Sequence, residues 1–484
     1  MSESLKSKTA KALVWKFAER GLYQVVAFAV QVVLVRLLAP EQFGAMAIMQ
    51  VFLVLSNSLV QSGLSNALVR AERVSERDYT AVLNLSFLMA LVLYLAVFLI
   101  APFAADFYVI EELSAELRVL ALVLFVNAFQ SVQVARANRE LKTKSIMKST
   151  LAGSLVSGTV AIALAAVGMN AWALVCQTML MQVVCCISLR IIEGWSPRIG
   201  LGLKEARRFW AFGWKVAASG LVFNAYQNVF DLVVGKALSA HALGLFSQGR
   251  KIPYIIFNSF DGSIQTVMLS SLSKVQDDSE RFVRVLRRMV KTGVLVVAPI
   301  MLFVASSAGC LVPLVFGQEW ASSAPVVTVF AIGYSLSSVS SSNQQALNAL
   351  GRSDIFLKLE VAKAVTGLSI FGAVLLASGE VVVIACGAGF VLLLATAINS
   401  IPVKRLTGYG YRAQIKDVAP TYISACLSAA LSFAAGLLCE GLLLSFFVQC
   451  AVMFASYIVV LWATKNESAS YVWRHIRKRK VTSS

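Results

Sequence analysis

The sequence predicts an all-α polytopic membrane protein with about fourteen transmembrane helices. Its 484 residues are 58% hydrophobic and 14% charged, whereas soluble domains contain about 25% charged residues. The apolar residues form repeated runs of about 18 or more, long enough to cross a hydrocarbon core of about 30 Å as helices. Basic residues are concentrated in every second connection between these runs. Together these observations exclude a soluble globular domain.

Each predicted span is an apolar run that ends at charged residues or at a break containing Gly or Pro. The spans cover residues 12–36, 43–67, 81–104, 117–135, 149–168, 171–189, 209–235, 243–272, 290–314, 322–349, 357–378, 381–402, 419–438 and 441–463. Because the first run is too long for a signal peptide and lacks a cleavage pattern, we expect it to remain as a spanning helix. The even number of spans predicts that both termini lie on one side of the membrane.

The distribution of charge predicts which side that is. One set of connections holds most of the 43 Lys and Arg residues, whereas the other holds only Arg36 and Lys236, beside acids such as Asp106 and Glu319. The positive-inside rule then places both termini in the cytoplasm. The net charge of +18 therefore reflects orientation, and no nucleic-acid partner is predicted. The eight Cys occur without a CxxC or Cys/His pattern, so we expect no metal site.

Two lobes of six helices are predicted, followed by two more helices. The longest basic connection, residues 191–208, joins an N-terminal lobe over residues 1–190 to a C-terminal lobe over residues 209–402. Residues 403–463 supply the two additional helices, and residues 464–484 form a basic cytoplasmic tail. We expect this tail to lie on the anionic inner leaflet.

An internal repeat supports the two lobes. The segment QVVLVRLLAPEQFG, which ends at Gly44, is echoed about two hundred positions later by DLVVGKALSAHALG, which ends at Gly244. The alignment pairs Arg36 with Lys236 as well as the two glycines. Both segments follow an even number of spans, so the repeats are parallel. Repeats of this kind are a sequence signature of transporters.

Three motifs in the N-terminal part of the chain carry a family resemblance: RLLAPEQFG, SGLSNALVR and ARANRELKTKSI. With these motifs the sequence resembles the polysaccharide transporter family, the Wzx-type flippases of the multidrug/oligosaccharidyl-lipid/polysaccharide exporter superfamily, and the colanic acid exporter type most of all. The resemblance implies two lobes in a V around a central cavity, with alternating access. It also implies an oligosaccharide linked to undecaprenyl diphosphate, moved to the outer leaflet of the bacterial inner membrane for lipopolysaccharide or exopolysaccharide synthesis. Membrane lipids, and a polymerase and glycosyltransferases of the same pathway, are the implied partners.

Charged and polar side chains inside the predicted spans are the candidate binding residues, because a charge at the bilayer centre costs about 2.5–3.5 kcal/mol on insertion scales. Fixed cations suit a lipid diphosphate, and the candidates are Arg20, Lys215, Arg250 and Lys251. Amides and hydroxyls suit sugars, and the candidates are Gln24, Gln31, Asn57, Gln61, Asn224, Gln227, Asn228, Tyr254, Asn258 and Gln265. The carboxylates that could bind a coupling proton or sodium ion are Glu19, Asp231 and Asp261. No other cofactor is predicted.

Simpler interpretations remain open for several polar residues. Arg36 and Lys236 form the predicted outer rim, where interfacial anchoring and stabilisation of a helix C-terminus compete with substrate contact. Glu360 and Lys363 are three residues apart on one helix, which favours an internal pair. The serine run from Ser335 to Ser342 is typical of close packing between helices as well as of a sugar site.

Two other functions stay open. A cation-coupled multidrug exporter of the same superfamily would favour acidic cavity residues, whereas the bases within these spans outnumber the acids. A membrane polysaccharide polymerase or ligase would need a large outer loop, whereas the outer connections here are short. There is also no Walker A pattern GxxxxGK[ST] for an ATP-driven pump. We therefore expect a transporter and not an enzyme.

Overall fold

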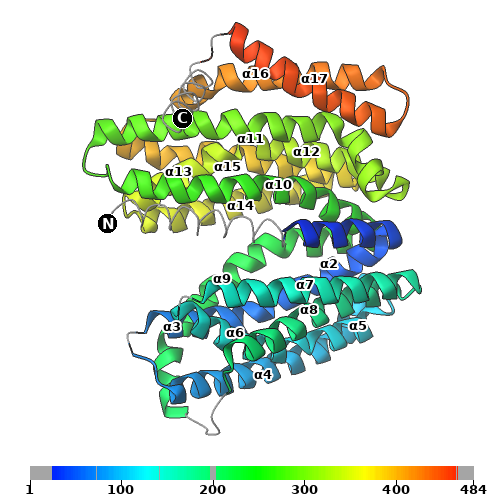
Figure 1. Ribbon diagram of the computed structural model, residues 1–484, viewed down its shortest axis with the longest axis vertical. Coiled ribbons are helices and arrows are strands. Elements are labelled where there is room, and N and C mark those ends of the chain that lie inside the picture. The colour runs from blue at the N-terminus through cyan, green and yellow to red at the C-terminus, as the bar shows by residue number, and fades with distance from the viewer. Residues whose placement is uncertain (1–23, 72, 141, 197–202, 465, 467–484) are drawn as a thin grey trace, which may run out of the picture. The chain divides into compact units, whose positions relative to one another are not determined.

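The computed structural model describes residues 24–71, 73–140, 142–196, 203–464 and 466, and these residues form an all-helical protein (Figure 1). Ten of the described helices are long and apolar enough to cross a membrane, and one bent pair would make eleven. The predicted fold class is therefore confirmed, and the chain is a multi-pass membrane protein. Helices are expected here because lipid offers no partner to a backbone amide, so each segment must satisfy its own hydrogen bonds.

The helices of the chain pack into two compact units, unit 1 (Met1–Gly244) and unit 2 (Leu245–Ser484). The sequence assigned residues 209–235 to the second lobe, whereas the corresponding helix α9 (Leu203–Ala237) packs on helices of unit 1. The units therefore divide later than the basic connection suggested. The lobe boundaries of the transport cycle stay a prediction.

Unit 1 begins with the helix Gln24–Leu37. It continues with α2 (Pro40–Asn57), the π turn η1 (Ser58–Ser62), α3 (Gly63–Arg70), α4 (Glu76–Tyr108), α5 (Leu113–Ala121), α6 (Val123–Arg139), α7 (Thr143–Ala166), α8 (Asn170–Glu193) and α9. Local chemistry sets several of these ends. Pro40 occupies the first turn of α2, where its missing N–H is harmless. Ser75 and Asp78 form a reciprocal capping box that begins α4.

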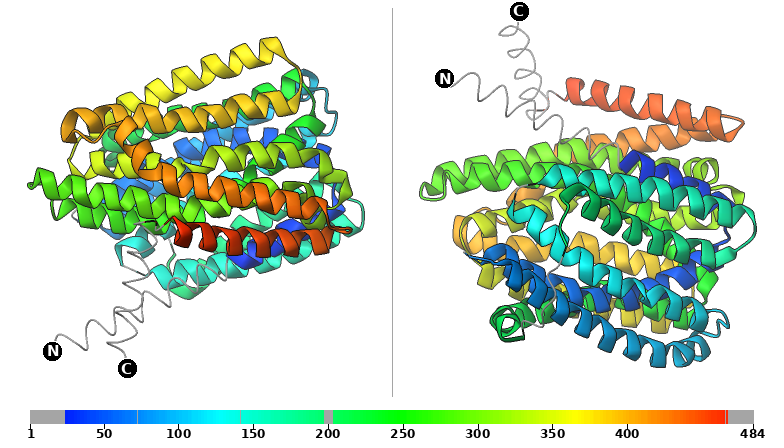
Figure 2. Two further views of the ribbon diagram at one scale, coloured as in Figure 1. Left: turned by 90° about the horizontal axis from the view of Figure 1, so that it is seen from above. Right: turned by 60° about the horizontal axis from the view of Figure 1, so that its bottom comes forward.

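Unit 2 takes most of α10 (Ala240–Ser273), whose first turn belongs to unit 1. It continues with α11 (Ser279–Phe316), the 3-10 turn η2 (Gln318–Ser323), α12 (Ala324–Ser335), α13 (Ser337–Ala349), α14 (Ser353–Ala377), α15 (Val381–Thr407), α16 (Tyr411–Leu437) and α17 (Leu442–Ala463). The span that ends in α13 is bent by 40° where α12 stops. The two additional helices, α16 and α17, lie beside α11 in both views of Figure 2 and share its hydrophobic core.

Candidate functional site

The two segments of the internal repeat meet at the first turns of α2 and α10. A Cβ atom on Gly44 would lie 1.8 Å from the Ala240 carbonyl oxygen, and one on Gly244 would lie 1.9 Å from that of Pro40. Both contacts lie within unit 1. Neither position has room for any side chain, which explains why glycine stands at both. The two repeated segments therefore contact each other reciprocally in the structure, which the alignment alone did not predict.

Charged side chains lie close to this helix crossing. Glu41 Oε1 is 2.7 Å from His241 Nδ1, and both side chains are about half exposed. Lys236 Nζ donates a hydrogen bond of 2.6 Å to the Phe107 carbonyl, near the C-terminus of α4, and lies 4.3 Å from the Phe107 ring centroid. A cation at a helix C-terminus is stabilising. The structure thus supports the interpretation that Lys236 stabilises a helix C-terminus, although this is the C-terminus of α4 and not that of its own helix α9.

Polar side chains also form hydrogen bonds around the π turn η1 in unit 1. Asn127 Nδ2 donates to Asn57 Oδ1 at 2.9 Å, and Asn224 Nδ2 donates to Ser58 Oγ at 2.7 Å. Asn228 Nδ2 donates to the Asn224 carbonyl at 2.8 Å. The first two bonds join α2, α6 and α9 where the helix changes its hydrogen-bond register, and π turns are frequent at functional sites. Two residues predicted to bind sugar, Asn57 and Asn224, therefore hold helices together in this structure, whereas the bond of Asn228 lies within α9.

The remaining predicted residues differ in how far their side chains are buried within the protein, and their contact with substrate stays a prediction. Glu19 and Arg20 lie outside the described residues, as does the side chain of Lys215. Among the described candidates, the side chain of Asp231 is buried, and the half-buried ones are those of Gln31, Gln61 and Arg250. The exposed side chains are those of Gln24, Arg36, Gln227, Tyr254 and Asn258, and Lys251 lies on α10.

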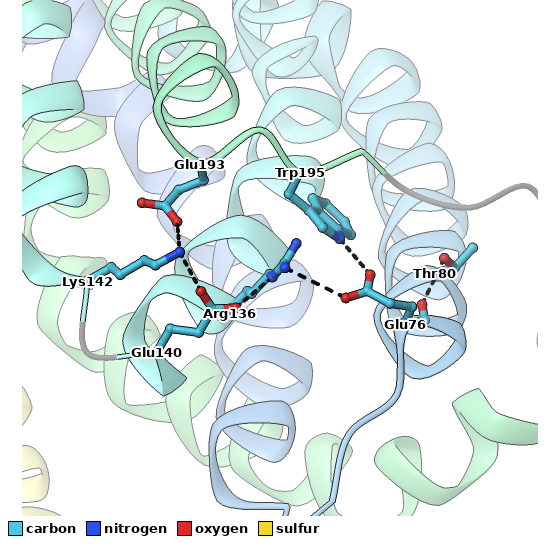
Figure 3. A network of polar contacts seen from close by, with 7 residues as sticks. All are labelled: Glu76, Thr80, Arg136, Glu140, Lys142, Glu193 and Trp195. Atoms are coloured by element: carbon cyan, nitrogen blue, oxygen red, sulfur yellow. Dashed lines mark hydrogen bonds and ion pairs between the residues drawn. The ribbon is translucent and has the colours of Figure 1, made fainter.

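The motif ARANRELKTKSI carries an ion-pair network at the end of unit 1 where α4 begins (Figure 3). Arg136 Nε donates to Glu140 Oε1 at 2.9 Å, and Arg136 Nη2 lies 3.8 Å from Glu76 Oε1. Lys142 Nζ lies 2.6 Å from Glu140 Oε2 and 2.7 Å from Glu193 Oε2. Hydrogen bonds from Lys142 and Arg136 hold the pKa of the Glu140 carboxyl below its ordinary value. The network connects α4, α6 and the end of α8.

Trp195 fastens the chain after α8 to the same network. Its Nε1 donates to Glu76 Oε2 at 2.9 Å, and its ring packs on those of Tyr79 and Phe129 with centroids 6.2 and 5.9 Å away. Arg139 adds hydrogen bonds to main-chain carbonyls at the end of α3. The family motif thus fixes four helix ends together. Sequence spacing could have predicted only the Arg136–Glu140 pair, four residues apart, because the other partners are distant along the chain.

Helix α13 is the polar centre of unit 2. Asn343 and Gln414 exchange amide hydrogen bonds of 2.9 and 2.8 Å, and both side chains are fully buried. Ser335 Oγ lies 2.9 Å from the Tyr422 hydroxyl, and Asn399 donates to Ser340 Oγ at 2.6 Å. The serine run is therefore engaged in packing between helices. The predicted pair of Glu360 and Lys363 on α14 is confirmed at 2.5 Å.

A buried carboxylate lies where α10 faces α13. Asp261 is 3% exposed, and its Oδ2 accepts hydrogen bonds from the Gln265 amide and, at 2.9 Å, from the Ser341 hydroxyl. Gln265 Oε1 accepts in turn from Gln345 Nε2 at 2.8 Å. The structure therefore brings together Asp261 and Gln265, two residues that the sequence predicted for different roles.

Two compact helical units with polar side chains inside the spans define the class of protein, a polytopic membrane protein. The fold matches that of the lipid II flippase MurJ in an inward closed conformation, with a TM-score of 0.77 and 12% identity over 95% of this chain and 99% of that one. A model of the polysaccharide biosynthesis protein family matches residues 33–325, and the chain belongs to this family.

Two curated relatives are similar along most of their length. The lipopolysaccharide biosynthesis protein WzxC of Escherichia coli (strain K12) is 23% identical over 90% of this chain and 89% of that protein. The succinoglycan biosynthesis transport protein ExoT of Rhizobium meliloti (strain 1021) is 21% identical over 77% of this chain and 76% of that protein. Each match is longer than either unit, so each includes residues of both units.

Proposed function

We propose that this protein moves a lipid-linked oligosaccharide from the cytoplasmic to the outer leaflet of the bacterial inner membrane, for the synthesis of a surface polysaccharide. The observation that carries the proposal is the similarity to WzxC over 90% of this chain, because it includes both units rather than one segment. The name of ExoT describes transport in the synthesis of succinoglycan. The fold is that of a protein named for flipping lipid II, which supports a related substrate class.

The proposed substrate is an oligosaccharide on undecaprenyl diphosphate. Its anionic diphosphate needs cations in a region of low dielectric, where one ion pair at about 4 Å is worth about 4 kcal/mol at an effective dielectric of 20. Arg20, Lys215, Arg250 and Lys251 would supply these cations. The protein alternates access between two sides of the membrane, with both termini in the cytoplasm. In this proposal the glycosyltransferases of the pathway act before the transporter, and the polymerase acts after it.

Deletion of the gene in its host, followed by complementation, tests the proposal. The deletion strain should accumulate lipid-linked oligosaccharide on the inner leaflet and lose surface polysaccharide, and the native chain should restore both. Normal lipid-linked oligosaccharide in the deletion strain would remove the proposed function. Increased sensitivity to cationic drugs in that strain would instead indicate a drug exporter.

Two variants test the cationic residues. Arg20→Ala and Lys215→Ala should fail to restore export at unchanged protein levels in the membrane. Arg281→Ala is the matched control, because it removes one exposed cation near the start of α11 and should export normally. Full export by both test variants would exclude the cationic binding surface but not transport itself.

A further inference from the structure

Asp261 is a buried acid whose hydrogen bonding is incomplete. The carboxylate is 3% exposed and receives both of its hydrogen bonds, from Ser341 and Gln265, on Oδ2. Its other oxygen, Oδ1, is buried and has no hydrogen-bond partner among the described residues. An ionised carboxylate left in this way inside a membrane protein is costly. A proton on Oδ1 would remove the charge and leave both existing bonds in place.

The charged groups of the surrounding helices do not neutralise Asp261. Helix α13, which faces it, contains no titratable residue. On α14, Glu360 and Lys363 pair with each other at 2.5 Å, and Gln344 Nε2 donates to Glu360 Oε1 at 3.1 Å. On α10 itself, Lys251 precedes Asp261 by about 15 Å along the helix axis. No described basic side chain forms an ion pair with Asp261.

Two basic residues of α11 have an acidic partner elsewhere. Helix α11 packs against α13, and its bases nearest that end of unit 2 include Arg287 and Lys291. These lie 2.8 and 3.7 Å from the carboxylate of Asp417 on α16. These two bases of α11 therefore pair with Asp417, and Asp261 is a buried acid that a proton could neutralise.

The atoms around Asp261 suit a proton better than a metal ion. Hard cations such as sodium need several oxygen ligands with free lone pairs. Here the neighbours present hydrogens: the Ser341 hydroxyl and the Gln265 amide both donate to the carboxylate. The amide oxygen of Gln265 accepts a hydrogen bond from Gln345 Nε2. The described residues also contain no group of three His, Cys, Asp or Glu that could hold a metal ion.

Amide side chains connect this acid to the surface of unit 2. Gln345 Nε2 donates to Gln265 Oε1 at 2.8 Å, and Asn348 Nδ2 lies 3.4 Å from Gln345 Oε1. Asn348 is exposed, at the end of α13 that precedes the basic connection at Arg352. The line from Asp261 through Gln265 and Gln345 to Asn348 is polar throughout. It ends on the side that the charge pattern predicts to be cytoplasmic.

We propose that Asp261 is the proton-binding carboxylate of unit 2, reached from the cytoplasmic side along Gln265, Gln345 and Asn348. The proton binds to Oδ1 and is later released from it, and no covalent bond to carbon changes. In the transporter proposed above, on which this coupling role rests, uptake and release of this proton link substrate movement to the proton gradient. Proton binding itself requires no substrate and can be measured on the purified chain.

The test is labelling of the purified full-length protein with dicyclohexylcarbodiimide, which reacts with protonated carboxyl groups in apolar surroundings. Mass spectrometry should find the adduct on the peptide that contains Asp261, and labelling should fall as the pH is raised. Asp417, which is paired with Arg287 and Lys291, is the internal control and should remain unlabelled. The measurement uses the native chain, so no variant has to fold. Absence of labelling at Asp261 across the pH range would overturn the proposal.

Two further arms separate the alternatives. Protection of Asp261 by sodium chloride, but not by choline chloride, at constant pH would replace the proton by sodium and overturn the proposal. In the complementation assay, the isosteric variant Asp261→Asn should lose export at a normal membrane level. Normal export by this variant would refute the coupling role while leaving the flippase function intact. Conversely, pH-dependent labelling in a protein whose deletion leaves lipid-linked oligosaccharide unchanged would retain the proton site and remove the flippase function.

Discussion

The reciprocal crossing of α2 and α10 allows a quantitative prediction for Gly44→Ala and Gly244→Ala. The added Cβ atoms would lie 1.8 and 1.9 Å from backbone carbonyl oxygens, where ordinary contacts begin at 3.4 Å. The backbones must therefore separate by roughly 1.5 Å, since neither obstacle is a side chain that can rotate away. Overpacking costs about 1–3 kcal/mol, and a backbone obstacle places each variant near the upper limit. About 3 kcal/mol corresponds to roughly a hundredfold change in an equilibrium constant.

Disulfide cross-linking measures this change. In a chain whose eight native cysteines are replaced, Glu41→Cys and His241→Cys should cross-link readily, because each follows directly on a residue, Pro40 or Ala240, whose backbone touches the facing helix. Adding Gly44→Ala or Gly244→Ala should lower the rate strongly. The same separation relieves both clashes, so the double alanine variant should lose little more than either single variant.

A control on the same helix isolates the clash from the change in residue type. A Cβ on Gly262 of α10 would meet nothing within 4 Å, so Gly262→Ala should cross-link like the parent. Its helix should gain about 0.8–1 kcal/mol from the better propensity of alanine. Unchanged cross-linking in Gly244→Ala, or fully additive losses in the double variant, would refute the close reciprocal contact.

Three further predictions concern stability, each measured by unfolding of the purified protein in detergent. Trp195→Phe keeps the ring packing but loses the bond to Glu76, so it should cost about 1 kcal/mol; no loss would show that this bond contributes nothing. Asn343→Leu leaves the buried Gln414 Oε1 without its donor, although Gln414 Nε2 keeps its bond to the Tyr409 carbonyl, and Gln414→Leu leaves the buried Asn343 amide without its partner. Each should cost about 1–3 kcal/mol, whereas the double variant should recover part of the loss; additive losses would contradict a mutual pair. The pKa of Glu140 is lowered in the folded protein from an ordinary value of 4.5. The ionised carboxylate therefore stabilises the folded protein above pH 4.5, and this stabilisation disappears as the pH falls through the lowered pKa. Glu140→Gln should flatten this dependence of stability on acid pH, and an unchanged profile would contradict the reasoning.

The order and place of the helices follow from the sequence alone. In lipid every backbone polar group must be satisfied within its own helix, so the apolar runs and charged breaks suffice to locate them. The three motifs also predicted the family from the sequence, and the family match covers residues 33–325. The predicted pair of Glu360 and Lys363 needed only the three-residue spacing on one helix.

The interior of the spans was less predictable. The spacing of the residues around Ser58 does not indicate a π turn, and no Pro marks the 40° bend at Leu336. Both interruptions depend on partners in other helices, such as Asn224 at Ser58 and Tyr422 beside Ser335. Several polar side chains that the sequence predicted to bind substrate, such as Asn57, Asn224 and Asp261, form hydrogen bonds to other side chains of the protein, and their contact with substrate stays a prediction.

By itself, the sequence determined that the chain crosses the membrane repeatedly, that it contains a repeat, and which family it resembles. Only the tertiary structure decided what the repeat does at Gly44 and Gly244, which unit holds α9, and that Asp261 is buried with one oxygen unpartnered. The physical reason is distance along the chain. Helix formation in lipid is local, whereas the Gly44–Ala240, Glu76–Trp195 and Asp261–Ser341 contacts join residues that only packing brings together.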